Sequence, residues 1–213
     1  MPRLCKQTRE HLTSVMRSKI RTEFVRLIAE HQAGQSVTME DVATSLGIAK
    51  GTIYLYYKTK DELVLDAWTA ERNAQFEKIR RKLQPGIPAP EQLAYCAEIM
   101  MEDFRKSRWL RLEFFRNNPF PAPRKPDRLI SLFSGILRTG IEEGSFRSVP
   151  VEDTALFIRN AIIGQFRYLL RTGEPLDMER SMGVFRDMIL RALRNDAKPR
   201  AACVRSRNQS ERS

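Results

Sequence analysis

The sequence predicts an all-α protein. Apolar residues recur with helical spacing from about residue 13 to residue 195 of the 213-residue chain. No run of alternating β-branched residues bounded by turns indicates a strand. Glycine and proline interrupt the helical pattern at intervals, which predicts short connections between several helices. The length alone allows one large domain or two small ones.

The first predicted helix covers residues 16–32. Its apolar residues have the spacing i, i+4, i+7 and i+8, which places them on one face of a helix. They are Ile20, Phe24, Leu27 and Ile28. Gly34 and Ser36 then indicate a turn.

Two further helices are predicted to begin at threonines. Thr38 precedes Asp41 by three residues, and Thr59 precedes Glu62 by three residues, as in a capping box. We expect the box at Thr59 to be the better of the two. Gly47 lies between the two starts and tolerates left-handed geometry, so the segment predicts a helix, a tight turn and a second helix.

The rest of the chain predicts a series of longer helices. One runs from residue 60 to about Leu83, and others cover about 91–106, 127–143, 151–172 and 176–195, with breaks at 84–90 and at the proline-rich 117–126. The tail 198–213 is polar and basic, which predicts disorder.

Composition and charge place few limits on function. The chain is 42% hydrophobic and 30% charged, as in ordinary globular proteins. Its net charge of +11 is spread along the sequence, so it supports a nucleic-acid partner only weakly. Because there is no signal-like segment and no run of about 18 apolar residues, the expected location is the cytoplasm. Three cysteines without a C-x-x-C pair predict neither a disulfide framework nor a metal site, and we expect no cofactor.

The stretch GTIYLYY, residues 51–57, carries the clearest functional signal. On a helix at about 100° per residue, Ile53 and Tyr57 share one face, and Gly51, Thr52, Leu55 and Tyr56 lie opposite, with Tyr54 at the edge. The inward pair suits the core. The outward set would be exposed apolar surface unless a partner covers it, and an α-helix fits the DNA major groove.

The outward residue types suit particular contacts with DNA. Gly51 permits close approach of the backbone, Thr52 suits a base edge or a phosphate, and Leu55 suits a thymine methyl group. Tyr54 and Tyr56 suit phosphates at the rim of the groove. Lys50 suits a guanine, and Lys60, at a helix start, suits a phosphate.

A core role is the alternative for the tyrosines, and a solvated face is the alternative for the lysines. We favour the core role for Tyr57 but not for Tyr54 or Tyr56, because the same stretch holds Gly51 and Thr52. Glu40 opposes DNA binding mildly, since an acid repels phosphate. The predicted DNA-binding set is Thr38, Lys50, Gly51, Thr52, Tyr54, Leu55, Tyr56 and Lys60.

The segment VTMEDVATSLGIAKGTIYLYYKTKDELV, residues 37–64, resembles the DNA-binding signature of the tetracycline-repressor (TetR/AcrR) family of bacterial transcriptional regulators. The resemblance implies an N-terminal three-helix DNA-binding domain and a variable helical domain that dimerises and usually binds a small effector. The sequence departs from the pattern at Tyr56-Tyr57, at Glu23 where alanine is usual, and in a basic arm, Arg3 to Arg21. That arm either contacts DNA or is a frayed, solvated start of the chain.

The helix predicted at 151–172 has two apolar stripes. Ala155, Ile158, Ile162, Phe166 and Leu169 suit the protomer's own core. A second stripe suits a symmetry-related helix, because alanine and glycine allow close approach. This second stripe comprises Phe157, Ala161, Gly164 and Tyr168. Phe185 and Ile189 of the last helix complete the predicted dimer interface, although an internal core explains these two equally well.

An effector pocket is predicted between the middle helices. Its candidate lining is aromatic, although core packing is the better explanation for any single member: Tyr95, Phe104, Trp109, Phe114 and Phe115. The sequence does not indicate the charge of the effector.

These patterns predict a ligand-responsive regulator that binds a palindromic operator as a homodimer. Repression is the usual mode of the resembled family, and activation stays open. The predicted domains are 1–66 for DNA binding, 67–196 for effector binding and dimerisation, and 197–213 as a disordered basic tail. A non-specific nucleic-acid binder that uses basic arms is the alternative. We do not expect an enzyme, because His11 and His31 are the only histidines and no catalytic motif is found.

Overall fold

The computed structural model describes residues 6–30, 36–117, 127–172 and 177–195, and the helices in these ranges confirm the all-α prediction. The predictions for 118–126 and for the tail lie outside the described residues. The helices are α1 (Lys6–Glu30), α2 (Met39–Ser45), α3 (Lys50–Tyr56), α4 (Lys60–Lys82), α5 (Ala89–Lys106), α6 (Arg108–Asn117), α7 (Arg128–Glu142), α8 (Val151–Thr172) and α9 (Met178–Leu193).

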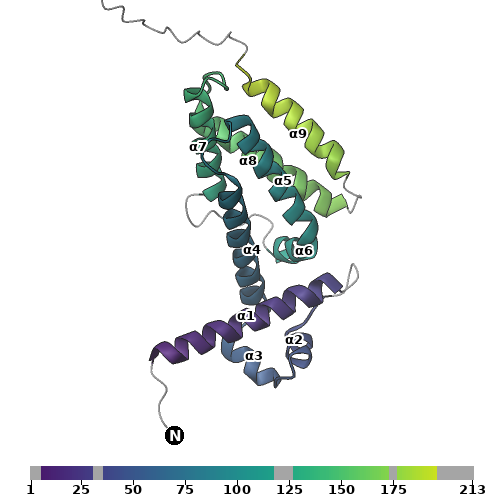
Figure 1. Cartoon of the computed structure of the whole chain (residues 1–213). Coiled ribbons are helices and arrows are strands. Elements are labelled where there is room, and N and C mark those ends of the chain that lie inside the picture. The colour runs from purple at the N-terminus through teal and green to yellow at the C-terminus, as the bar shows by residue number, and fades with distance from the viewer. Residues whose placement is uncertain (1–5, 31–35, 118–126, 173–176, 196–213) are drawn as a thin grey trace, which may run out of the picture.

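The helices form two groups that α4 connects (Figure 1). At one end, α1 crosses the first turns of α4, and α2 and α3 pack beneath α1. At the other end, α5, α7, α8 and α9 form a bundle, in which α7 packs along α8 and α9 packs on α5. The short helix α6 lies at the end of the bundle that faces α1.

The N-terminal group has its own hydrophobic core, which confirms the inward face predicted for the 50–57 helix. Ile20 and Phe24 from α1 and Ile53 from α3 are fully buried in it, together with Tyr57 just after α3. Burying one such aliphatic or aromatic side chain contributes about 1.5–3 kcal/mol. These contacts hold α2 and α3, helices of 7 residues each that would be marginal in isolation.

The first helix begins at Lys6, ten residues before the predicted start at residue 16. The part of the predicted basic arm from Lys6 onward is therefore helical, including Arg17 and Arg21, which the predicted helix already contained. Both side chains pair with acids of α4, Arg17 with Glu62 and Arg21 with Asp66. The sequence pattern missed the extension because residues 7–15 are all exposed and have no buried apolar stripe.

The capping prediction was wrong in its ranking. Thr38 forms the complete box: its hydroxyl accepts from the Asp41 N–H at 3.1 Å, and the Asp41 carboxylate accepts from the Thr38 N–H at 2.7 Å. At Thr59 only the first half is present, a 3.1 Å bond from the Glu62 N–H. The Glu62 carboxylate instead accepts from the Lys58 N–H and pairs with Arg17.

The bundle encloses a second core. The predicted inward stripe of α8 is buried in it at Ala155, Ile158, Ile162 and Phe166, while the Leu169 side chain lies outside the described residues. Phe166 stacks on Phe104 of α5 with ring centroids 4.2 Å apart. The predicted inward stripe is thus confirmed as the face of α8 that packs in the protomer's own core.

The sequence did not predict α6 as a separate helix. It follows α5 directly after Ser107, whose N–H bonds to the Asp103 carbonyl oxygen at 2.9 Å. Leu110 and Phe114 of α6 are buried in the N-terminal core, and Phe115 contacts both cores. Both faces of α6 are therefore covered, which removes the clear periodicity of a half-exposed helix.

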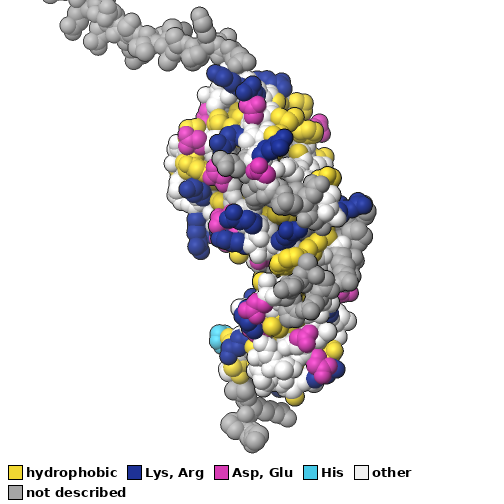
Figure 2. All heavy atoms as spheres, turned by 90° about the vertical axis from the view of Figure 1, so that its right-hand side faces the viewer, with side chains coloured by type: hydrophobic (Ala, Val, Ile, Leu, Met, Phe, Trp, Pro, Cys, Tyr) yellow, Lys and Arg dark blue, Asp and Glu magenta, His cyan; other side chains and the backbone are white. Residues whose placement is uncertain are grey.

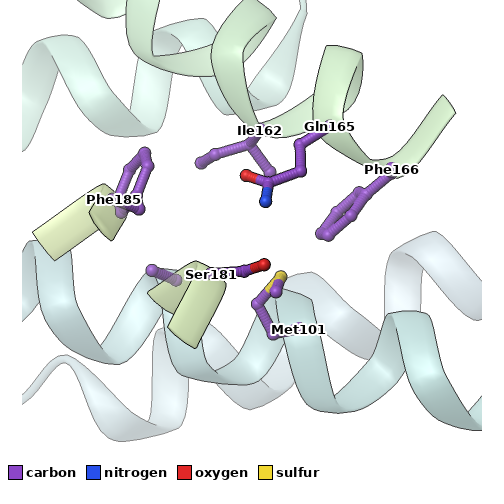
Figure 3. Close-up of a pocket in the computed structure, with 7 residues that line it drawn as sticks. Met101, Ile162, Gln165, Phe166, Ser181 and Phe185 are labelled. Atoms are coloured by element: carbon purple, nitrogen blue, oxygen red, sulfur yellow. The ribbon is translucent and has the colours of Figure 1, made fainter. Parts of the chain in front are cut away.

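A small gap remains in the second core between α5, α8 and α9 (Figure 3). Its volume is about 10 Å³, which is the room of about one water molecule. Gln165 and Ser181 contribute polar groups, and the rest of the lining is apolar: Ala97, Met101, Ile162, Phe166 and Phe185. A drug-sized ligand would require this gap to widen.

Several large apolar side chains remain exposed on the bundle. They include Leu156 and Phe157 of α8 and Val184 and Met188 of α9. Figure 2 shows hydrophobic side chains among numerous lysines and arginines on this part of the surface. Within the described ranges, none of the helices is both long and apolar enough to cross a bilayer.

Replacing the cap of α2 tests the capping geometry. Thr38→Ala removes both the acceptor for the Asp41 N–H and the hydroxyl that donates to its carboxylate, and should lower the free energy of unfolding by about 1 kcal/mol in chemical denaturation. Thr69→Ala is the matched control, because the exposed Thr69 hydroxyl bonds only within its own helix. Equal losses in the two variants would contradict the reciprocal cap.

Candidate functional site

The turn between α2 and α3 has the geometry of a helix-turn-helix. Gly47 adopts a φ of 65°, a left-handed conformation that favours glycine. The Ile48 N–H then bonds to the Ala43 carbonyl oxygen at 3.0 Å and closes the end of α2. The chain can therefore reverse in four residues and begin α3 at Lys50.

The helix α3 separates its residues into a buried face and an open face. Ile53 and Tyr57 are fully buried, whereas Leu55 is 74% exposed and Tyr54 is 38% exposed. Gly51 is exposed too, and an added Cβ there would have no atom within 4 Å. The open face thus combines apolar surface with unobstructed backbone.

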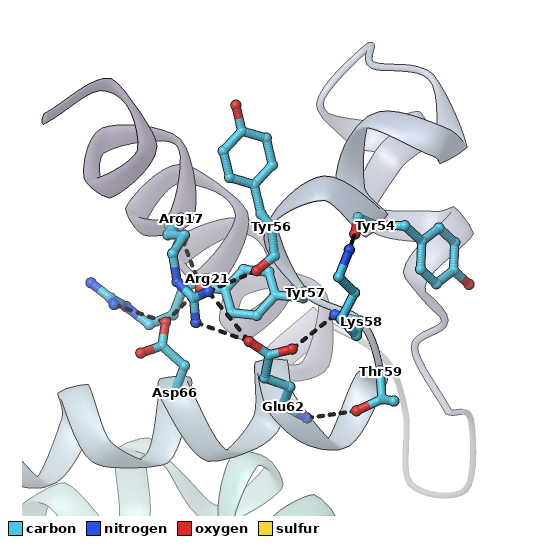
Figure 4. Close-up of polar contacts among 9 residues, drawn as sticks. All are labelled: Arg17, Arg21, Tyr54, Tyr56, Tyr57, Lys58, Thr59, Glu62 and Asp66. Carbon is cyan, nitrogen blue, oxygen red and sulfur yellow. Dashed lines mark hydrogen bonds and ion pairs between the residues drawn. The ribbon is translucent and has the colours of Figure 1, made fainter. Parts of the chain in front are cut away.

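Tyr57 anchors α3 from below (Figure 4). Its hydroxyl donates to Asp66 Oδ2 at 2.5 Å and lies 3.1 Å from the Arg17 carbonyl oxygen. Burial, followed by the hydrogen bond to Asp66, raises the pKa of Tyr57 above its usual range. The Arg17 guanidinium covers the Tyr57 ring at 4.2 Å from its centroid. Tyr57 is therefore a structural residue, as the sequence analysis favoured.

Arg17 also fixes the end of α3. Its Nη1 donates to the Tyr56 carbonyl oxygen at 2.7 Å and to Glu62 Oε1 at 3.3 Å. The rings of Tyr54 and Tyr56 point away from this network and away from α4 (Figure 4). Tyr54 is exposed, whereas Tyr56 is half-buried and also packs against the N-terminal core.

Three lysines near α3 have partners within the protomer. Lys50 Nζ pairs with Glu40 Oε2 at 2.6 Å, and this hydrogen bond raises the pKa of Lys50. Lys60 Nζ pairs with Glu113 Oε1 at 2.5 Å and donates to the Ser36 hydroxyl at 2.6 Å. Lys58 Nζ donates to the Tyr54 carbonyl oxygen at 3.2 Å. Each of the three ammonium groups thus already has a hydrogen-bond partner within the protomer.

Glu23 has a positioning role that the sequence analysis missed. Its carboxylate accepts from Arg26 and from the Ser45 hydroxyl, which ties α1 to the end of α2. The hydrogen bond from Arg26 lowers the pKa of Glu23 to about 2. The only sequence signal was the departure from alanine in the resembled pattern.

The structure brings most of the predicted DNA-binding residues together. Lys50, Gly51, Thr52, Tyr54, Leu55 and Tyr56 lie on α3, and Lys60 begins α4. Thr38 is exposed at the start of α2, where it serves as the cap.

The predicted effector-lining residues do not line the gap between α5, α8 and α9. Phe114 stacks on Trp68 at 4.7 Å, and Phe115 meets the same ring edge-on at 5.8 Å. Tyr95 is covered by Lys82, and Trp109 by Arg108. Phe104 alone lies close to the gap, through its stacking on Phe166. The lining of this gap comes from α5 and from α8 and α9, which are distant from α5 in sequence, and periodicity cannot bring such helices together.

The predicted interface residues divide by helix. On α8, Phe157 and Tyr168 are 65% and 58% exposed, and Ala161 and Gly164 are exposed between them. On α9, Ile189 is buried in the protomer's core and Phe185 lines the gap. These two residues of α9 therefore lie on its inner side and not on an exposed stripe.

The fold and the open face of α3 define a helix-turn-helix transcriptional regulator. Residues 25–67 match the family model described as bacterial regulatory proteins, tetR family. This segment therefore has the DNA-binding module of the TetR family, in agreement with the resemblance of residues 37–64 to that family.

Known relatives and solved structures agree with this assignment. The chain is 25% identical over 167 residues to the HTH-type transcriptional regulator YhgD of Bacillus subtilis (strain 168), covering 75% of this chain and 87% of that protein. It shares its fold with a transcriptional regulator from Saccharomonospora viridis in complex with choline, at 21% identity and a TM-score of 0.71, covering 85% and 98% of the two chains. Thermus thermophilus FadR in complex with lauroyl-CoA has a TM-score of 0.62 at 20% identity, with 86% and 97% covered.

Loss of the hydroxyl should affect the stability of the protein differently at the buried Tyr57 and at the exposed Tyr54. Tyr57→Phe removes a buried donor to Asp66 and should lower the free energy of unfolding by about 1–2 kcal/mol. Tyr54→Phe should change it by less than about 0.5 kcal/mol, because this side chain is exposed. Thermal and denaturant unfolding of both variants would measure the difference. The anchor role is wrong if Tyr57→Phe is as stable as the wild type.

Proposed function

We propose that the chain is a ligand-responsive repressor, which binds a palindromic operator as a homodimer and is released by a small-molecule effector. In this proposal, residues 1–66 bind DNA and residues 67–196 bind the effector and dimerise. Residues 197–213 form a basic tail outside the described residues.

The exposed face of α3 carries the proposal. Leu55 is 74% exposed although its helix also has fully buried positions, and Tyr54 and Gly51 lie exposed beside it. An exposed apolar face on a helix of the width of a major groove is best explained by a duplex that covers it. Leu55 then meets a thymine methyl group, and the tyrosine hydroxyls meet phosphates.

The lysines have to exchange partners on binding. Lys50 is held by Glu40, and Lys60 by Glu113 and Ser36, in the free protein. A phosphate or a guanine offers each ammonium a replacement, so we assign base recognition to Lys50 and Thr52 and phosphate contact to Lys60. Exposed ion pairs contribute little stability, so the exchange at Lys50 and Glu40 has a low cost.

Dimerisation follows from the outer side of the bundle. We propose that Phe157, Ala161, Gly164 and Tyr168 of α8 pack against the same stripe of a second copy about a twofold axis. Val184 and Met188 extend this apolar surface on α9, in place of Phe185 and Ile189. Such a dimer presents two α3 helices to successive major grooves about 34 Å apart, which makes the operator palindromic.

Effector response requires that the bundle and the DNA-binding helices be coupled. The short helix α6 provides this connection, because Glu113 holds Lys60 while Leu110 and Phe114 pack in the N-terminal core. A ligand that prefers a different position of α6 would lower operator affinity through that difference alone. The similar structures that hold choline and lauroyl-CoA support a small molecule as effector.

Selection of duplexes from a random pool tests the DNA-binding assignment. The wild type should enrich a palindrome, and Lys50→Ala or Thr52→Ala should change the enriched bases. Tyr54→Phe, Tyr56→Phe and Lys60→Ala should each weaken binding to all duplexes, by about 1 kcal/mol, which is about fivefold. Unchanged affinity when Tyr54, Tyr56 and Lys60 are replaced together would refute the assignment.

Deleting residues 197–213 distinguishes a sequence-specific regulator from a non-specific nucleic-acid binder that uses basic arms. A specific regulator keeps its preference for the selected palindrome, because α3 reads it. A binder that depends on basic arms loses most of its affinity and shows no preference to begin with.

The dimer face can be tested by placing a charge in it. Phe157→Glu should convert the dimer into monomers at micromolar concentration, since two like charges would meet at the twofold axis. Sedimentation velocity would measure the oligomeric state, and Leu12→Glu is the matched control, because Leu12 is 51% exposed on α1. A Phe157→Glu protein that stays dimeric would place the interface elsewhere.

A further inference from the structure

Four arginines lie near one another on α4, α6, α7 and α8, and two of them, Arg72 and Arg111, lie over the Trp68 ring. We call this group the arginine cluster and define it as Arg72, Arg111, Arg128 and Arg159. Each comes from a different helix, α4, α6, α7 and α8 respectively. Like charges gathered from four helices repel one another, so their placement calls for a physical reason.

Arg111 is the most deeply placed member. It is only 6% exposed, and its guanidinium carbon lies 5.0 Å from the Trp68 ring centroid, 5.4 Å from Phe104 and 5.8 Å from Phe166. Its Nε donates to the neutral Ser107 hydroxyl at 3.2 Å. No carboxylate of the described residues lies within ion-pair distance of it. A buried cation without a paired anion is rare in proteins.

Arg72 lies near Arg111 but is only half-buried. Its guanidinium carbon lies 5.7 Å from the Trp68 ring centroid, on which Arg111 also rests. Among the described residues it has ring contacts but no hydrogen bond or ion pair. Burial lowers the pKa of Arg72 from its usual value, and the charges of Arg159 and Arg128 lower it further against the attraction of Asp127. Burial likewise lowers the pKa of Arg111 to about 10.

The nearby acids do not neutralise these two guanidinium groups. Asp127 pairs with Arg159 at 2.8 Å and also caps α7, and Asp103 pairs with Lys78. Glu71 attracts Arg111 but makes no ion pair with it. The segment 118–126, which joins α6 to α7, contains no acidic residue in its sequence.

The cluster adjoins the gap in the second core. Phe166 lines that gap and also lies against Arg111, and Phe104 stacks on Phe166 at 4.2 Å. The gap is apolar apart from Gln165 and Ser181. A positive charge therefore lies at one side of an aromatic pair, and apolar lining lies at the other.

We propose that Arg111 and Arg72 bind the acidic headgroup of an effector, a carboxylate or a phosphate, whose apolar body enters the gap between α5, α8 and α9. This rests on the proposed effector-responsive function and names the chemical class of the effector. The acid satisfies the two guanidinium groups through charge-assisted hydrogen bonds. The apolar body widens the gap by moving α9 outward, since a 10 Å³ volume cannot hold it.

Four probes with one twelve-carbon chain and different headgroups test the proposal: dodecanoate, dodecyl phosphate, dodecanol and dodecyltrimethylammonium. Each is titrated below its micelle-forming concentration into the full chain without DNA, and binding is followed by calorimetry and by tryptophan fluorescence. At least one acid should bind about tenfold or more tightly than dodecanol, and the cation more weakly than dodecanol. The two acids distinguish a carboxylate site from a phosphate site.

Matched variants assign the effect to the cluster. Arg111→Met and Arg72→Gln should each remove the preference for the acid and leave dodecanol binding unchanged. Arg80→Gln is the control on α4, because the Arg80 side chain is 79% exposed and pairs with the nearby Glu77. It should keep the wild-type preference.

The stability of the ligand-free variants separates binding from structure. Arg111→Met should keep or raise the midpoint of thermal unfolding, because it replaces an uncompensated buried charge with an apolar side chain. Arg111→Lys keeps the charge without the guanidinium fork and should retain only part of the preference.

Three results would overturn the proposal: dodecanol binding as tightly as both acids, neither acid binding below millimolar concentration, or the preference surviving in Arg111→Met. Failure of the proposed function would look different. A protein that prefers the acid but enriches no duplex from a random pool would keep this site and lose the operator assignment.

Discussion

The polar contacts beneath α3 are the constraint on which the DNA-binding half of the structure depends. Tyr57 is sealed in the core, yet its hydroxyl reaches Asp66 on α4, while Arg17 of α1 covers its ring and holds the Tyr56 carbonyl oxygen. One network thus joins α1, α3 and α4, and Glu62 extends it through Arg17. Because Tyr57 is fully buried, its hydrogen bond to Asp66 is costly to break without replacement, and the half-exposed Arg17 and Glu62 add further contacts that hold α3 in one orientation. Rigid support allows the open face of α3 to carry exposed apolar groups without collapsing onto the core.

The second organising element is α6, which takes part in both cores. Its residues Leu110 and Phe114 pack beside α1 and α4, and Arg111 points into the group of rings that continues to Phe166 in the bundle. Glu113 on the same helix holds Lys60 at the first turn of α4. A shift of α6 by an ångström would therefore be felt at both ends of the molecule, because packed interiors transmit displacement instead of absorbing it. This geometry gives the proposed effector response a physical route.

The guanidinium group of Arg111 is buried in the interior of the bundle, and no acid of the described residues pairs with it. Buried guanidinium groups stacked on aromatic rings gain some cation–π attraction, but this does not replace the hydration that an ion loses on burial. The adjoining gap is too small for more than about one water molecule. A mostly apolar space beside a cation that has no ion pair is therefore a place where a ligand of suitable shape and opposite charge gains binding energy from both. The same arrangement lowers the stability of the free protein, as is common at functional sites.

The sequence by itself determined the helical class, most helix bounds and the two faces of α3, because these depend on local periodicity and on caps encoded within a few residues. It also placed Ile53 and Tyr57 inward correctly. Only the tertiary structure decided which capping box is complete, since Arg17 draws the Glu62 carboxylate away from the Thr59 cap. It also decided the existence of α6 and the lining of the gap. Each of these depends on contacts between residues tens of positions apart, and one-dimensional spacing contains no information on such contacts.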